Sequence, residues 1–138
     1  MLLDMLPFGS FREIETNIIE ATIFEGVELD RHRIDLVVAG LTERYGQGRY
    51  GILSNRINRY SHTHESMQAL AGLVNLGGFA ILVYSSISTV AAGIHELYQE
   101  NAKVFYARSA AIEWLRLSLA PVDPRVVPEQ RRETTVMF

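Results

Sequence analysis

Short apolar runs alternate with stretches of helical periodicity along most of this chain. Three of these runs end in a turn that bears Ser or Thr and then lead into a helical pattern: Tyr50–Ile57, Phe79–Tyr84 and Val104–Tyr106. This repeat predicts three consecutive strand–helix units. In such folds the carboxyl ends of the strands and the amino ends of the helices lie on one rim, where free backbone N–H groups favour binding. We therefore expect functional residues at this rim.

The amino-terminal part of the chain has the pattern of one or two further strands followed by a helix. The stretch Glu13–Phe24 is rich in Ile and Thr, and it fits either one long strand or a hairpin that turns at Thr16-Asn17. Asp30 is a candidate N-cap for a helix that ends at Gly46. The apolar positions of this helix fall at i, i+3, i+4, i+7 and i+11, and they are Ile34, Val37, Val38, Leu41 and Tyr45.

Each later strand is followed by a predicted helix. The first is capped by Thr63 or Ser61 and ends at a Gly77-Gly78 turn, and the last covers Ala110–Leu119. Phe79–Tyr84 holds no polar residue except its terminal tyrosine, so we expect a strand that is covered on both faces. The helix after it carries an apolar stripe that we expect to face the core, formed by Ile87, Val90, Ala91, Ile94 and Leu97.

The length of 138 residues suits one domain with one core. We expect residues 1–12 to be a lead-in and residues 13–120 to form the α/β domain. The remaining residues, 121–138, contain three prolines and a polar stretch, so we expect them to form a mobile tail.

Composition excludes several classes of function. The net charge is -3 and the arginines are dispersed, which argues against a nucleic-acid partner. The chain has no cysteine, which excludes disulfides, thiolate catalysis and cysteine-ligated metals and makes the cytoplasm the simplest location.

One uncharged segment has the length of a membrane span. No residue is charged between Ser66 and Ile94, but Gln68, Asn75 and several serines divide the segment. The longest apolar run inside it has the length of a strand, so we expect no membrane insertion. Met1–Leu6 contains an acidic residue and no basic one, which makes it a poor secretory signal.

Three segments of the chain are similar in sequence to a known class of domain. The order of strand, helix and three strand–helix units, with a Ser/Thr cluster at the start of the second helix, resembles the STAS domain of anti-sigma factor antagonists. More narrowly, three segments resemble a family of small uncharacterised bacterial proteins with STAS-like folds: Tyr50–Ser61, Leu76–Val83 and Val104–Leu115. The last helix of that family ends in Ala-x-x-Trp-Leu, as Ala111–Leu115 does here. The resemblance covers about Glu13 to Ala120 and implies a STAS-like α/β fold, with a single four- to five-stranded mixed sheet and about four helices.

The resemblance also implies candidate phosphoacceptors. STAS antagonists are phosphorylated on a serine that follows an aspartate at the amino end of the second helix. The corresponding junction here offers the hydroxyls of Ser61 and Thr63, but it lacks the preceding aspartate. A phosphate there would lie near helix N–H groups and near Arg56 and Arg59. The alternative is that these hydroxyls only cap the helix.

Polar side chains at the end of the strand Tyr50–Ile57 are the candidate contacts with a ligand or partner. Arginine can hold a carboxylate or phosphate through two hydrogen bonds, and amides can add further ones. The candidates are Asn55, Arg56, Asn58, Arg59 and Tyr60. The alternative for each residue is that its side chain ties down a neighbouring loop.

His62 and His64 raise the question of a metal site, because alternating histidines can share a metal. Zinc requires three or four ligands, and only Glu65 or distant histidines could complete the set. We therefore expect ordinary exposed loop histidines, no bound metal and no cofactor.

Two classes of function remain compatible with the sequence. The chain has no nucleophile elbow, no paired carboxylates at a strand end and no HExxH motif, which disfavours an enzyme. We expect a non-catalytic, STAS-like regulatory or protein-interaction module with a protein partner, and the sequence leaves a homodimer open. The alternative is a carrier of a small apolar ligand, as in CRAL-TRIO domains, which would need an apolar cavity of several hundred cubic ångströms between sheet and helices.

Overall fold

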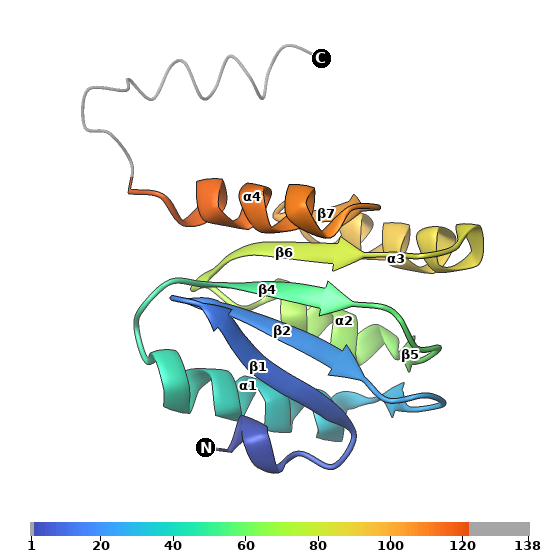
Figure 1. The fold of residues 1–138 in the computed structure, drawn as a ribbon. Coiled ribbons are helices and arrows are strands. Elements are labelled where there is room, and N and C mark those ends of the chain that lie inside the picture. Colours follow the sequence, from blue (N-terminus) through green and yellow to red (C-terminus); the bar gives the residue numbers. More distant parts are fainter. Residues whose placement is uncertain (1, 122–138) are drawn as a thin grey trace.

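The computed structural model describes residues 2–121 and contains a five-stranded mixed sheet with helices on both faces (Figure 1). The strand order is β1-β2-β4-β6-β7. Strands β1 and β2 are antiparallel, and every other neighbouring pair in this sheet is parallel. The α/β fold class and the mixed sheet predicted from the sequence are confirmed.

The strands of this sheet are β1 (Gly9–Glu15), β2 (Ile18–Ile23), β4 (Tyr50–Asn55), β6 (Leu76–Leu82) and β7 (Ala102–Phe105). A separate parallel pair is formed by β3 (Glu28–Leu29) and β5 (Ser61–His62). The helices are η1 (Leu3–Met5), α1 (Arg31–Tyr45), α2 (His64–Ala71), α3 (Ser86–Tyr98) and α4 (Arg108–Leu119).

The β-rich stretch near the amino terminus is a hairpin rather than one long strand. Its turn includes Asn17, whose φ of 65° is in the left-handed region that asparagine tolerates. The first strand starts at Gly9, so the sheet begins inside the segment that we expected to be a lead-in. Leu3, in η1, is 3% exposed and contacts the close-packed Gly40 of α1, so this segment belongs to the core.

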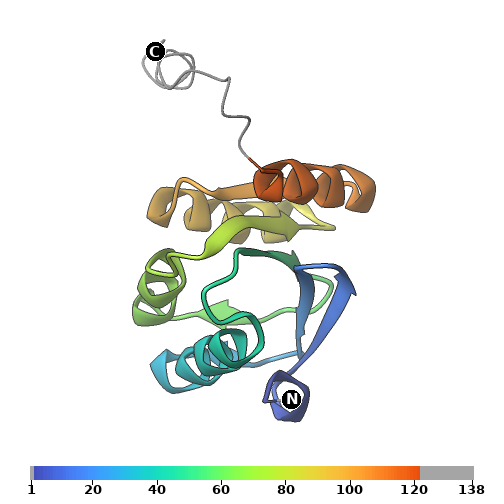
Figure 2. The ribbon, with the colours of Figure 1, turned by 90° about the vertical axis from the view of Figure 1, so that its left-hand side faces the viewer.

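Helices cover the two faces of the sheet unequally. Figures 1 and 2 show α4 alone on one face and α1 and α2 on the other. The larger core lies under α1 and α2 and includes Ile34, Leu41 and Phe79, while Leu115 of α4 packs in the smaller one. Asp30 caps α1 as predicted, because its carboxylate accepts a hydrogen bond from the N–H of Arg33.

The prediction of a turn at Gly77-Gly78 is wrong, because both glycines lie in β6. A Cβ at Gly77 would come within 2.8 Å of side-chain atoms of Arg49 and Leu119, and one at Gly78 within 3.1 Å of Ser118. The glycines therefore allow α4 to lie close to the strand, which is a packing role rather than a turn role.

The predicted orientation of α3 is also wrong. The apolar stripe that was expected to face the core points outward, with Ile87, Val90 and Leu97 at 75%, 74% and 84% exposed. The buried residues of α3 are Ala92 and His95. The apolar periodicity of this helix therefore marks its outer face. The tail expected at 121–138 lies outside the described residues except for Pro121.

Candidate functional site

The carboxyl ends of β2, β4, β6 and β7 lie along one edge of the sheet, because these strands are parallel. The loop after β4 and the amino ends of α3 and α4 meet at this rim (Figure 1). The candidate residues from the sequence are distributed over three separate environments there.

Asn55 belongs to a polar network on the α4 side of the rim. Its Nδ2 donates to Glu20 at 2.9 Å, and its Oδ1 accepts from the Tyr84 hydroxyl at 2.8 Å. Glu20 is 6% exposed and also accepts two hydrogen bonds from the Arg108 guanidinium. These bonds from Arg108 lower the pKa of Glu20 despite its burial. Asn55 therefore binds the buried carboxylate of an ion pair whose arginine is half-exposed.

Asn58 and Arg59 fasten the loop that follows β4. The Asn58 Nδ2 donates to the Ile23 carbonyl at 3.0 Å, which ties the loop to the end of β2. The backbone N–H of Arg59 donates to Glu25, and its carbonyl accepts from Gly26, while its side chain is exposed.

Arg56 is buried, whereas most arginines lie at the surface; the residue is only 7% exposed. Its Nη2 donates to the Tyr60 carbonyl at 3.1 Å, and its guanidinium carbon lies 4.2 Å from the centroid of the Tyr60 ring. Its Nε is buried without a hydrogen-bond partner in the described part of the chain. The Tyr60 hydroxyl is in turn hydrogen-bonded to Ser54 at 3.0 Å.

His62 and His95 pack beside Arg56. Their ring centroids are 4.6 Å apart in an edge-to-face arrangement, and His95 also meets Phe79 edge to face. Burial, together with the nearby charge of Arg56, lowers the pKa of His95 to about 4 and holds the pKa of His62 well below its usual range. The expectation that His62 is an ordinary exposed loop histidine is therefore wrong.

His64 lies apart from His62. It is exposed at the start of α2, and its Nδ1 is hydrogen-bonded to the Tyr98 hydroxyl, whereas the Nδ1 of His62 is hydrogen-bonded to Ser66. Among residues 2–121 no group of three or more His, Cys, Asp or Glu side chains is arranged to hold a metal ion.

The two candidate phosphoacceptors differ in their hydrogen bonding. Thr63 is the N-cap of α2, and its hydroxyl accepts from the N–H of Ser66 at 3.2 Å. Ser61 lies in β5 with an exposed side chain; its backbone pairs with β3, and its N–H donates to the Val27 carbonyl. Ser61 is therefore the more accessible hydroxyl.

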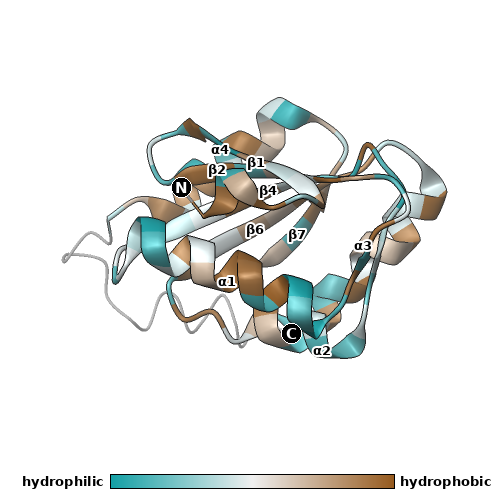
Figure 3. Ribbon diagram, turned by 90° about the horizontal axis from the view of Figure 1, so that it is seen from below, coloured by the Kyte–Doolittle hydropathy of each residue, from teal (hydrophilic) through white to brown (hydrophobic). Residues whose placement is uncertain are grey.

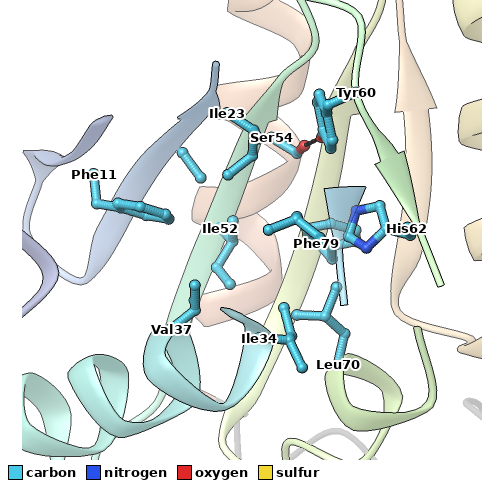
Figure 4. A pocket seen from close by; sticks show the side chains of 12 residues that line it. Phe11, Ile23, Ile34, Val37, Ile52, Ser54, Tyr60, His62, Leu70 and Phe79 are labelled. Atoms are coloured by element: carbon cyan, nitrogen blue, oxygen red, sulfur yellow. Dashed lines mark hydrogen bonds between the residues drawn. The ribbon is translucent and has the colours of Figure 1, made fainter. Parts of the chain in front are cut away.

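The space between the sheet and α1 and α2 is nearly filled. The cavity in Figure 4 has a volume of about 30 Å³ and is lined mainly by apolar side chains that point toward one another, such as Phe11, Ile52 and Phe79. A volume of this size corresponds to roughly one water molecule in the liquid. An apolar ligand therefore has no preformed space at this position.

Several apolar residues of α3 are exposed on the outer side of the helix, and Figure 3 shows apolar residues along α3. At the rim this outer side adjoins a solvent-open depression of about 710 Å³ that is lined by Val90 together with Tyr84 and Tyr106, which are 56% and 71% exposed. We call this region the α3 surface and define it as Ile87, Val90, Ile94, Leu97, Tyr84 and Tyr106.

Sequence reasoning missed the contributions of Glu20, Arg108 and Ser54 to the polar contacts at the rim. Glu20 stands between Ile19 and Ala21 within β2, and an acidic residue in this apolar stretch is the signal that could have marked a buried carboxylate. His95 falls three residues after Ala92 on the small-residue side of α3, which a search for apolar stripes passes over. None of the helices in the described residues is long and apolar enough to cross a membrane.

Comparison with known proteins supports the fold. No model of a known protein family matches the chain, and no curated protein matches it. A solved structure is similar to this chain with a TM-score of 0.54 at 11% sequence identity, and the match covers 78% of this chain and 91% of the other. That structure is an uncharacterised protein of the DUF3478 family, with a SpoIIAA-like fold, from Shewanella loihica PV-4. The chain thus has a SpoIIAA-like, or STAS-like, fold, as the sequence resemblance predicted.

Proposed function

We propose that this protein is a non-catalytic interaction module that binds a protein partner through the α3 surface. The observation that carries the proposal is the exposure of Ile87, Val90 and Leu97 along one side of α3. Single exposed apolar residues are common, but several on one helix face beside exposed tyrosines are typical of interaction sites.

Other features of the chain support this proposal over the alternatives. The cavity under α1 and α2 holds about 30 Å³, whereas pockets for small ligands usually have about 300–1,000 Å³, which disfavours an apolar carrier. The net charge of -3 disfavours a nucleic-acid partner. The absence of cysteine is compatible with the cytoplasm as the working location.

Phosphorylation is proposed as a means of regulation, and Ser61 is the preferred acceptor. Its hydroxyl is exposed, while that of Thr63 is engaged in capping α2. A phosphate on Ser61 would add negative charge beside the cavity that His95 and Ile94 of α3 line.

The proposal is tested by placing a charge on the α3 surface. Val90→Asp should abolish capture of the partner from extracts of the native host, because a carboxylate cannot be buried there without a counter-charge. Leu117→Asp is the matched control, since Leu117 is 67% exposed on α4. Retention of the same partner by Val90→Asp, in a folded protein, would contradict the proposal. Light scattering of both variants shows whether the partner is a second copy of the chain.

A further inference from the structure

A second cavity lies beneath α3, beside the exposed apolar face of the helix, and Ile94 borders both. It has a volume of about 200 Å³. Its lining includes Arg56, Tyr60, Ser61, His62, Ala91 and His95. It differs from the cavity under α1 and α2 because polar and ionisable side chains from β5, α3 and the loop after β4 converge on it.

Arg56 gives this cavity a positive charge that the protein does not neutralise. No carboxylate lines the cavity, and no carboxylate of the described residues forms an ion pair with Arg56. Burying an unpaired charge is costly, and proteins usually pair it with an opposite charge. By contrast, the half-exposed Arg108 is paired with Glu20.

The hydrogen-bonding capacity of Arg56 is also largely unused. Only Nη2 has an acceptor, the Tyr60 carbonyl, while Nε is buried without one. A guanidinium carries five N–H donors, so the N–H groups of Arg56 that reach the cavity can donate to the oxygens of a carboxylate or phosphate.

We propose that the cavity beneath α3 is a binding site for a small oxyanion, a carboxylate or a phosphate group, held by Arg56. The anion supplies the counter-charge that Arg56 lacks. The volume of about 200 Å³ is ample for such a group. This inference does not depend on the docking of a partner on the outer face of α3.

His62 and His95 should make anion binding at this site depend on pH. Ser66 donates its hydroxyl proton to the Thr63 carbonyl, so it accepts from the Nδ1–H of His62 and leaves Nε2 unprotonated in the neutral ring. A bound anion offsets the charge of Arg56 and raises the pKa of both His62 and His95. The titratable or charged groups lining the cavity are Arg56 and Tyr60 from the loop, His62 from β5 and His95 from α3; α2 contributes only Met67. Anion binding should therefore strengthen as the pH falls below neutral.

The direct test is a titration of the full chain with inorganic phosphate and, separately, with acetate, each against potassium chloride at the same ionic strength. The imidazole NMR signals of His62 and His95 should shift and saturate. His32, exposed at the start of α1, serves as an internal reference and should not follow them. Equal shifts at all histidines, or none, would overturn the proposal. The anion that saturates at the lower concentration indicates whether the natural ligand carries a phosphate or a carboxylate.

Two variants test the role of Arg56 and of the space itself. Arg56→Met should weaken binding of the preferred anion at least about tenfold, whereas Arg59→Met, which changes an exposed arginine of the same loop, should leave it within about twofold. Ala91→Leu fills the cavity without altering its charge and should also abolish binding. Undiminished binding by Arg56→Met overturns the proposal. If Arg56→Met does not fold, the proposal is overturned instead by undiminished anion binding in Ala91→Leu.

Discussion

The imidazole of His62 meets the imidazole of His95 edge to face, with the ring centroids 4.6 Å apart. One ring comes from the short strand β5 and the other from α3, so the pair joins a rim strand to the helix that carries the α3 surface. The pKa of each ring is lowered by burial and by the positive charge of Arg56. Both rings are therefore neutral at pH 7.

This pair predicts a loss of stability in mild acid. In the unfolded chain a histidine takes up a proton near pH 6.5, whereas His95 in the folded protein does so at about pH 4. Stability is therefore complete above pH 6.5 and falls as the pH decreases toward 4. His95 alone should contribute a loss of about 2–3 kcal/mol between pH 7 and pH 4.5, measured by urea unfolding.

The control for this prediction is a histidine substitution on the surface. His95→Gln should flatten the dependence of unfolding free energy on pH in this range, while His32→Gln should leave its slope unchanged. An unchanged slope in His95→Gln would show that other groups cause the acid sensitivity.

The ion pair between the buried Glu20 and the half-exposed Arg108 should matter more for stability than pairs between two exposed side chains. Glu20→Gln leaves Arg108 without its charged partner and disturbs the bond from Asn55, so we expect a loss of about 1–3 kcal/mol in the free energy of unfolding. Glu15→Gln, which breaks the exposed pair with Arg116, should have little effect. Equal effects of the two substitutions would contradict a stabilising role of the buried network.

The glycines of β6 should not tolerate side chains. Gly78→Val places a branched side chain where a Cβ already lies within 3.1 Å of Ser118, so we expect α4 to be displaced and the protein to be destabilised by about 1–3 kcal/mol. Gly93→Ala in α3 is a suitable comparison, because nothing lies within 4 Å of a Cβ there. Thermal unfolding of both variants provides the measurement, and a tolerated valine would contradict the close approach of α4.

Removing the hydroxyl of Thr63 should affect stability differently from removing that of Ser61, because only Thr63 caps a helix. Thr63→Ala removes the cap of α2 and should cost about 1 kcal/mol, whereas Ser61→Ala should be nearly neutral. If Ser61 is a regulatory acceptor, Ser61→Glu should alter partner binding without a change in melting temperature. Loss of stability in Ser61→Ala would show that this hydroxyl is structural as well.

Local signals were sufficient to predict most of the elements. Asp30 and the regular spacing of apolar residues specify α1, since the cap and the buried face of this helix both depend on nearby residues. The apolar run of β6 indicated an interior strand, and it does lie between β4 and β7. Its glycines were misread because a turn and a close helix contact both require the absence of a side chain.

The candidate site was less predictable, because burial at the rim depends on tertiary contacts. The outward face of α3 has the stronger apolar pattern, so periodicity assigned the wrong face to the core. Arg56 looks like a surface residue in sequence, yet the ring of Tyr60 and the helix α3 enclose it. Asn55 was selected as a contact residue, but the buried partner Glu20 lies on a different strand.

Site-specific photocrosslinking in the native host is the decisive measurement for contact between the α3 surface and a protein partner. A photoreactive amino acid at Leu97, 84% exposed on α3, is compared with one at Leu117, 67% exposed on α4. We expect one discrete adduct at position 97 that is absent at position 117 and is lost when Val90→Asp is added. Adducts of the same kind at both positions, or none at position 97, would show that the α3 surface is not the docking site.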